Sequence, residues 1–261
     1  SSADGGATWR ELHDFSADTE SSIVSLYFID EGFGWVVLRG DRLFETRHAG
    51  TTWREVSLPK SFRPRDVYCE TATKRLLVVG AIVTGDKGPA QDLPSKRPAI
   101  YWRDFDSKDW VPAGKFPVEG EFLQVASVHG GSLLAFGTQE VFFSEDSGKK
   151  WRPSTYEIGR VTDWSYEDEV YDGNPRAISS IEENLWLSHE SGFLLHSTDN
   201  GKTWGGFRPT RVPASTAPLC FRELFFIDKN VGFAIGTDSC FYYTTDSGKS
   251  WRLASNRSDF R

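Results

Sequence analysis

The chain contains the eight-residue stretch Ser197-Thr198-Asp199-Asn200-Gly201-Lys202-Thr203-Trp204, and stretches of the same pattern recur along its length. Each has a hydroxyl residue, then Asp (His in one copy), then Gly, and ends in Trp. The near-complete copies end at Trp9, Trp53, Trp151, Trp204 and Trp251, and a worn copy over residues 105–109 precedes Trp110. Repetition at ~40–50 residues indicates one supersecondary unit used several times in succession.

The residues between these turns are typical of short β-strands. In the second unit, residues 22–29 are β-rich, residues 35–38 and 43–46 follow after tight turns, and residues 53–56 come after the repeated turn. The last unit repeats the order over 224–227, 232–235, 241–244 and 251–253. No stretch combines helical periodicity with caps. The sequence therefore predicts an all-β chain built from four-stranded antiparallel units.

Turn chemistry explains the conserved order of residue types within the repeated turn. An Asp side chain accepts hydrogen bonds from backbone N–H groups just beyond it, and Gly adopts the left-handed region without steric cost. The Trp then covers the loop and packs between sheets. Asp146, Asp199 and Asp246 also suit catalysis or metal binding, but copies in several repeats favour a folding role. His48 stands where the others have Asp and is a weaker acceptor, which predicts a looser turn.

The repeated turn resembles the BNR, or Asp-box, family, whose consensus is Ser/Thr-x-Asp-x-Gly-x-Thr-Trp. The resemblance implies a β-propeller in which the box joins the third and fourth strands of each blade. The longer phrases Phe28-Ile29-Asp30 with Gly34-Trp35, and Phe226-Ile227-Asp228 with Gly232-Phe233-Ala234-Ile235-Gly236, are similar to repeats of photosystem II stability and assembly factors and related exported bacterial proteins. Those proteins are non-enzymatic binding propellers. Sialidases and sortilin-type receptors share the box, so the box does not identify a substrate.

The repeats predict a single propeller domain over residues 1–261. Five complete units end at Trp53, Trp110, Trp151, Trp204 and Trp251. A box and one outer strand, residues 9–12, stand before them, and ten residues follow Trp251. We expect six repeats, the first incomplete, with irregular ring closure; residues missing upstream are the alternative explanation.

Composition restricts the classes of partner. A net charge of −7 with mixed signs disfavours general nucleic-acid binding, and no apolar run reaches the ~18–20 residues of a membrane span. The five histidines and three cysteines show no ligand spacing, so we expect no metal and no cofactor. The cysteines are predicted to be free thiols. The absence of methionine suggests a processed chain, and we expect an exported monomer (periplasmic, lumenal or extracellular) whose signal has been removed.

Two insertions are predicted to lie on the face opposite the boxes, because blade connections alternate between two faces. Residues 85–97 join a second to a third strand, and residues 155–176 join two blades. Long loops on one face of a rigid scaffold commonly bind partners. The second insertion mixes acids with aromatics, which suits an interface anchor; an acidic solvated loop whose aromatics fold back is the equal alternative. Its candidate binding residues are Arg160, Trp164, Tyr166, Asp168, Glu169 and Tyr171.

Four arginines are predicted on the same face, Arg63 and Arg65 on one linker and Arg208 and Arg211 on another. Converging arginines clamp carboxylates or phosphates, although ordinary surface charge is the alternative. The predicted function is a non-enzymatic scaffold that holds a protein partner on this face. Such a scaffold would serve as an assembly or stability factor for an envelope or membrane complex, or as a toxin-neutralising binder. The alternative is a sialidase-like glycoside hydrolase using the arginines, but Phe62-Arg63-Pro64-Arg65 poorly matches that family's Phe/Tyr-Arg-Ile-Pro motif.

Overall fold

The computed structural model describes most of the chain as β-structure. The described residues are 1–5, 7–15, 22–87, 94–137, 140–157, 175–189, 192–212, 219–236 and 238–255. The chain divides into two compact units, Ser1–Val125 and Ala126–Arg261, and each is described by itself. Within the described ranges no helix is long and apolar enough to cross a bilayer.

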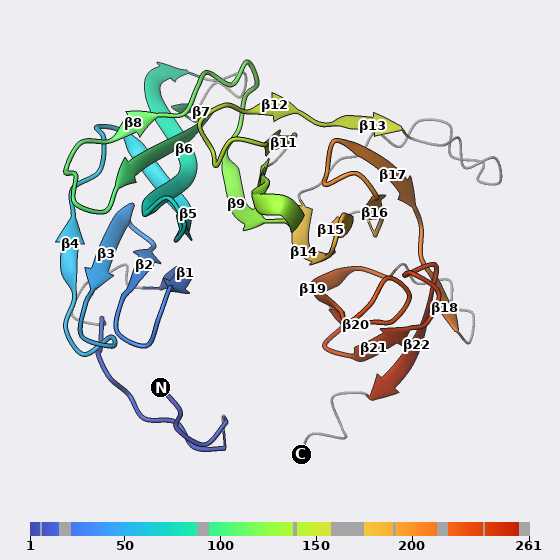
Figure 1. Cartoon of the computed structure of the whole chain (residues 1–261). Helices are drawn as coiled ribbons and strands as arrows, with labels where there is room; N and C mark the ends of the chain where they lie inside the picture. The colour runs from blue at the N-terminus through green and yellow to red at the C-terminus, as the bar shows by residue number, and fades with distance from the viewer. Residues whose placement is uncertain are drawn as a thin grey trace. The chain divides into compact units, whose positions relative to one another are not determined.

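The first unit contains two four-stranded antiparallel sheets in simple up-and-down order (Figure 1). The strands of the first sheet are β1 (Ile23–Phe28), β2 (Gly34–Leu38), β3 (Arg42–Thr46) and β4 (Arg54–Val56). Those of the second are β5 (Phe62–Glu70), β6 (Arg75–Lys87), β7 (Pro94–Asp104) and β8 (Val111–Pro112). Each sheet has the strand order of a propeller blade, with its repeated turn between the third and fourth strands.

Three further sheets complete the set of five. One has the order β12-β11-β10-β9, from β9 (Phe122–Ser127), which spans the division between the units, through β10 (Leu133–Gly137) and β11 (Val141–Ser144) to β12 (Arg152–Pro153). A short 3-10 helix, η1 (His129–Gly131), joins β9 to β10. The next is formed by β14 (Pro175–Ile181), β15 (Asn184–His189), β16 (Leu194–Ser197) and β17 (Thr203–Phe207). The last is formed by β19 (Phe221–Phe226), β20 (Gly232–Gly236), β21 (Phe241–Thr244) and β22 (Ser250–Ser255).

Two of these sheets carry a fifth strand that the repeats did not predict. β13 (Thr155–Glu157) pairs in parallel with β17, and β18 (Thr210–Val212) pairs in parallel with β22. The chain that leaves one blade thus runs along the outermost strand of the following blade before it enters that blade. The five predicted four-stranded units are confirmed, and the lead-in segments add to two of them.

Two local predictions were wrong. The predicted outer strand over residues 9–12 is not a strand; instead, the Ser1 amino group donates to the Arg10 carbonyl (2.7 Å) and the Arg10 N–H donates back (2.8 Å), which closes the first box on itself. Residues 85–87 and 94–97 of the predicted loop over 85–97 belong instead to strands β6 and β7, which pair as far as Val83–Lys96 and again at Lys87–Pro94.

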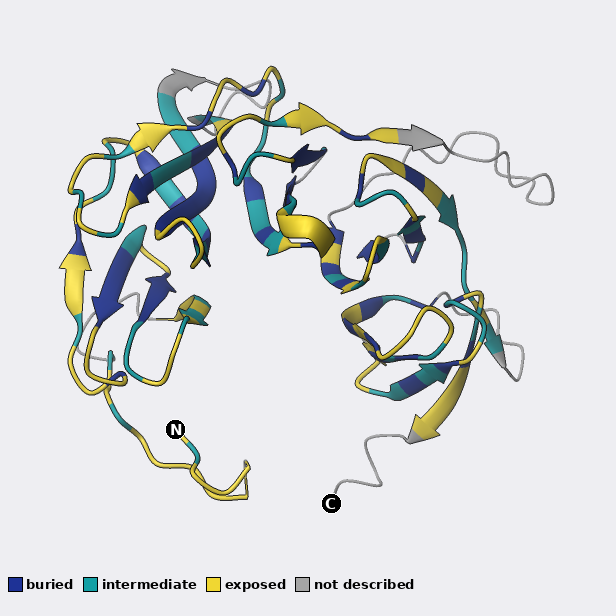
Figure 2. Ribbon diagram, in the orientation of Figure 1, coloured by how far each residue is buried: buried dark blue, intermediate teal, exposed yellow. Residues whose placement is uncertain are grey.

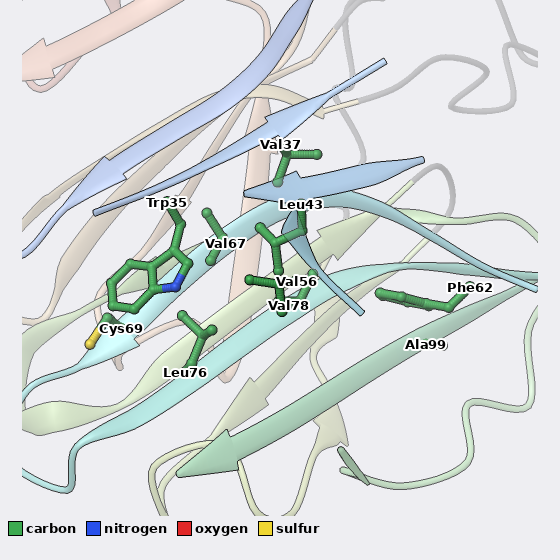
Figure 3. Packing of buried hydrophobic residues seen from close by; sticks show 10 residues of the cluster. All are labelled: Trp35, Val37, Leu43, Val56, Phe62, Val67, Cys69, Leu76, Val78 and Ala99. Atoms are coloured by element: carbon green, nitrogen blue, oxygen red, sulfur yellow. The ribbon is translucent and has the colours of Figure 1, made fainter. Parts of the chain in front are cut away.

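The core of the first unit lies between its two sheets. Trp35, Val37 and Leu43 from one sheet meet Val67 and Leu76 from the other, all buried, with Cys69 beside the indole (Figure 3). Strands β2 and β3 are buried along almost their whole length, whereas the outer strand β4 is mainly exposed (Figure 2). This burial gradient follows from blade geometry, in which faces stack on neighbouring blades and the outer edge meets solvent.

The second unit is held by aromatic contacts between blades. The Trp186 indole of β15 stacks on the Phe226 ring of β19 at 3.8 Å between centroids and 8° between planes, and donates to the Ser247 carbonyl (3.0 Å). Both side chains are buried, as is Trp251 nearby. A stack of this kind adds to the free energy of apolar burial. None of the three cysteines, all within the described residues, forms a disulfide, and β20 lies between the strands that follow Cys220 and Cys240, as predicted.

Candidate functional site

The aspartates of the repeated turns bind their own loops. In four copies an Asp oxygen accepts from the backbone N–H four residues later, at 2.8–2.9 Å. These bonds join Asp4 to Thr8, Asp146 to Lys150, Asp199 to Thr203, and Asp246 to Ser250. Burial alone would raise the pKa of Asp199, but the bonds from Thr203 and Ser197 outweigh it and lower that pKa. The contacts support the folding role that the sequence favoured for these carboxylates.

The other consensus positions of the box are also explained by hydrogen bonds. The Gly N–H donates to the first hydroxyl residue, as from Gly201 to Ser197 Oγ (2.9 Å), and the Trp indole donates to the Gly carbonyl, as from Trp204 (3.0 Å). Both Gly201 and the preceding Asn200 have positive φ. Trp204 and Trp251 are buried, whereas Trp9 of the first box is 77% exposed. The indole of a box therefore adds apolar burial where a neighbouring sheet covers it, and little of it at Trp9.

Two boxes depart from this pattern, and both lie in the first unit. In one, His48 replaces Asp, and its Nδ1 contacts Thr52 Oγ1 (2.9 Å). In the other, the last strand residue, Asp104, precedes its Trp by six positions instead of seven, and the described turn contains no residue with positive φ. There the Trp110 indole donates to the Ser57 carbonyl (2.7 Å) of the preceding linker instead of to its own turn.

The two faces of each blade are fixed by contacts between turns. On one side, the box face, the Ala49 N–H donates to the Gly32 carbonyl (2.9 Å) and the Ser247 N–H to the Asn230 carbonyl (3.0 Å). The repeated turns and the first-to-second-strand turns therefore share this face, as predicted. The second-to-third-strand turns lie at the other ends of the strands, on the opposite face.

Arg63 and Arg65 lie at the opposite face of the first unit, but on strand β5 and not on a linker as predicted. The β-rich run after Phe62 extends the strand to include them. Arg63 Nε is 3.1 Å from Asp41 Oδ2, in the second-to-third-strand turn of the preceding blade. Arg65 Nε donates to Glu121 Oε2 (2.7 Å), and Lys96 Nζ donates to Glu121 Oε1 (2.9 Å). Burial would raise the pKa of Glu121, but these two cations lower it.

Arg208 and Arg211 lie at the opposite face of the second unit. The Arg208 guanidinium lies over the Phe193 ring at 4.3 Å, and Arg211 Nη2 donates to Asp238 Oδ2 at 2.8 Å. The hydroxyl of Tyr242 donates to the same Asp238 oxygen (2.6 Å), and its ring lies 5.0 Å from the Arg211 guanidinium. Phe193 and Asp238 belong to second-to-third-strand turns, so both arginines are where the alternation rule placed them. Their binding role stays a prediction.

The remaining candidate residues, Arg160, Trp164, Tyr166, Asp168, Glu169 and Tyr171, lie outside the described residues. Their role in binding stays a prediction. Within the part of the chain that is described, no group of three or more His, Cys, Asp or Glu side chains is arranged to hold a metal ion.

One cavity was not predicted from the sequence. It has a volume of about 490 Å³ and lies at the box face of the first unit, between the repeated turn that ends at Trp53 and the worn turn that precedes Trp110. The signal that would have identified it is the deviation of these two turns from the consensus, which sequence reasoning treated as weakening of a structural motif.

Comparison with known proteins gives matches to solved structures alone. No family model matches the chain, and no curated protein matches it. The structure is similar to YCF48 from Cyanidioschyzon merolae, with a TM-score of 0.47 and 17% identity over 90% of this chain and 85% of that one. It is also similar to a structure of YCF48 bound to D1 peptide, with a TM-score of 0.42 and 16% identity over 92% of this chain and 82% of that one.

The fold belongs to the all-β class of propeller proteins, since five blade-type sheets follow one another along the chain. The repeated turns are Asp boxes, with the bonds that give the motif its consensus. The predicted resemblance to Asp-box propellers is confirmed by the strand order of the sheets and by the hydrogen bonds of the box turns.

Proposed function

We propose that the chain is a non-enzymatic propeller scaffold that holds a protein segment on the face opposite its Asp boxes. The observation that carries the proposal is the mixed charge of that face. At the ends of the blades opposite the boxes, partly exposed ion pairs join Arg63 to Asp41 and Glu121 to Arg65 and Lys96 in the first unit, and Arg211 to Asp238 in the second. Complementary charge of both signs favours selectivity for a polar protein surface.

The same ion pairs weigh against the glycoside hydrolase alternative. A hydrolase of that kind needs arginines whose donors are available to the substrate carboxylate. Arg63 and Arg211 each pair with a carboxylate of their own, so the positive charge of each is balanced within this chain and attracts such a substrate less strongly. The binder is therefore the better supported class.

The finer version of the proposal is a stability or assembly factor for an envelope or membrane complex, acting after export. The repeat phrases that end in Gly34-Trp35 and Gly232-Phe233 support this version through their resemblance to such factors. The insertion over 155–176 supplies the anchor in this scheme, because Trp and Tyr contribute most of the binding free energy at protein interfaces.

The test is capture of partners from source extract by the immobilised chain. Trp164→Ala and deletion of residues 160–172 are expected to abolish capture of the same specific protein, with the melting temperature nearly unchanged. Trp9→Ala is the matched control, because it removes an exposed indole from the box face. Undiminished capture by both loop variants would dismiss the loop. Turnover of a fluorogenic sialoside that is lost on Arg63→Ala or Arg208→Ala would overturn the binder class altogether.

A further inference from the structure

The cavity at the box face of the first unit has a basic wall. Arg47, Arg54 and Arg103 line it together with Lys108, and the acids in the lining are Glu45 and Asp106. Four cationic side chains therefore face two carboxylates. A volume of about 490 Å³ falls within the ~300–1,000 Å³ of typical small-molecule pockets.

The Glu45 carboxylate is hydrogen-bonded to all three guanidinium groups of the cavity. Its side chain is only 3% exposed, and its carboxylate accepts from Arg47 Nε (3.1 Å), Arg54 Nη2 (3.2 Å) and Arg103 Nη2 (3.4 Å). Three positive charges thus share one negative charge. Each guanidinium has five N–H donors, and Arg47 and Arg54, which are 53% and 72% exposed, each direct a single nitrogen to Glu45.

Arg103 is held rigidly at the floor of the cavity. It is 7% exposed, its Nη1 donates to the Ser107 carbonyl (2.9 Å), and its guanidinium lies 5.0 Å from the Trp110 ring centroid. Its Nε is buried and has no hydrogen-bond partner. Burial lowers the pKa of Arg103, and the nearby Arg54 and Arg47 lower it further, against the opposing effect of Glu45. The free chain therefore retains unneutralised positive charge here, a condition that an anionic ligand would relieve.

The walls of the cavity are aromatic and fixed. Trp53 donates its indole N–H to the Gly50 carbonyl (2.9 Å), and the Phe105 ring packs 5.5 Å from Phe33 and 5.7 Å from Trp35. The Arg47 guanidinium lies 4.5 Å from the Phe33 ring centroid, which holds that side chain over the cavity. A flat apolar group would therefore find rigid surfaces beside the arginines.

The same cavity is lined by both boxes that depart from the consensus. His48 and Thr52 come from the first of these turns, and Phe105 and Ser107 from the second. In the regular boxes an Asp satisfies the loop and a short hydroxyl residue satisfies the Gly N–H. In the first of these turns His48 replaces the Asp, although Thr46 Oγ1 still accepts from the Gly50 N–H (3.0 Å). In the second the turn is one position shorter, and the Ser107 carbonyl accepts from an arginine. Both turns therefore depart from the regular box at the place where the sequence gathers cations, which is typical of a functional site.

We propose that this cavity binds a small organic oxyanion, that is, a carboxylate or phosphate group carried on a flat apolar moiety. Arg47 and Arg54 bind the oxygens at the mouth, Glu45 and Arg103 hold these arginines in position, and Trp53 and Phe105 contact the apolar part. Guanidinium groups suit this task because their planar donors match both oxyanions in two-point contacts. The site lies on the box face and is independent of the proposed protein-binding face.

The test is calorimetric titration of the whole chain with four probes: benzoate, acetate, phenyl phosphate and inorganic phosphate. Saturable binding of benzoate or phenyl phosphate is expected, and each is expected to bind more tightly than acetate or inorganic phosphate. The better of the two aromatic probes identifies the oxyanion. The double variant Arg47→Gln/Arg54→Gln is expected to weaken binding about tenfold or more, since bonds to charged groups contribute ~1.5–3 kcal/mol.

Arg152→Gln is the matched control, because Arg152 follows the box Trp151 as Arg54 follows Trp53 but does not line this cavity. It is expected to change affinity less than about twofold. If the double variant melts early, the single variant Arg54→Gln, at the more exposed of the two arginines, provides the same test. Absence of saturable binding of every probe, or equal weakening in the Arg152 control, would overturn the proposal.

Discussion

Gly201 offers a direct test of how the boxes fit between blades. Its φ of +80° is in the left-handed region, and a Cβ added there would lie 2.5 Å from Leu134 Cδ2 of the neighbouring strand β10. Ala at Gly201 therefore has two costs: about 1–2 kcal/mol for the left-handed backbone and about 1–3 kcal/mol for overpacking against a buried Leu. We expect Gly201→Ala to lower the free energy of unfolding by roughly 2–5 kcal/mol.

Gly50 separates the two contributions. Its φ is +78°, but the nearest atom to an added Cβ is Leu12 Cδ1 at 3.5 Å, an ordinary contact. Gly50→Ala should therefore lower the free energy of unfolding only by the cost of the left-handed backbone, about 1–2 kcal/mol. Denaturant unfolding monitored by tryptophan fluorescence measures the free energy of unfolding of both variants.

A double-mutant cycle within the second unit checks the assignment to Leu134. Leu134→Val trims the side chain that the new methyl group would meet, so Gly201→Ala should be less damaging in that background by about 1–3 kcal/mol. Strict additivity of the two changes, or equal losses at Gly201 and Gly50, would refute the steric reasoning.

Two further outcomes are expected. Burial raises the pKa of Asp246, but the hydrogen bonds from Ser250 and Thr244, together with the nearby Lys249, outweigh burial and lower that pKa. The contribution of Asp246 to the free energy of unfolding is therefore present at neutral pH and is lost as pH falls from about 4 through the pKa of the folded state. Asp246→Asn should thus cost about 1–3 kcal/mol at pH 7 and progressively less as pH falls below about 4 in denaturant titrations, and a pH-independent loss would contradict this. Glu121→Gln leaves Arg65 and Lys96 without their shared carboxylate and should lower the free energy of unfolding by about 1–3 kcal/mol. Glu145→Gln, in the exposed pair with Lys202, should lower it by less than ~1 kcal/mol. Equal losses would show that burial does not strengthen the Glu121 ion pairs.

The strands and the box turns were predictable because their signals are local. The β-rich run 22–29 became β1, and the Asp, Gly and Trp positions of the boxes follow from backbone bonding within a few residues. The parallel pairing of β13 and β18 was not predictable, since three-residue segments carry no periodicity and their partners lie in a later repeat.

The candidate site was predictable only in part, for a related reason. The alternation of turns placed Arg208 and Arg211 at the correct ends of their blades, but it could not show that Asp238 lies within bonding distance of Arg211. The cavity beside Glu45 depends on side chains from two blades that are distant in sequence, such as Arg47 and Arg103. The spacing of these residues along the chain does not show that their side chains come together.

The lead-in strands also change the outer edges of two blades. An outermost strand such as β17 or β22 would otherwise present a row of unpaired N–H and C=O groups, which can pair with another chain. The three-residue strands Thr155–Glu157 and Thr210–Val212 pair with part of that edge. Shortening either strand would therefore leave more of β17 or β22 available for pairing with a second polypeptide.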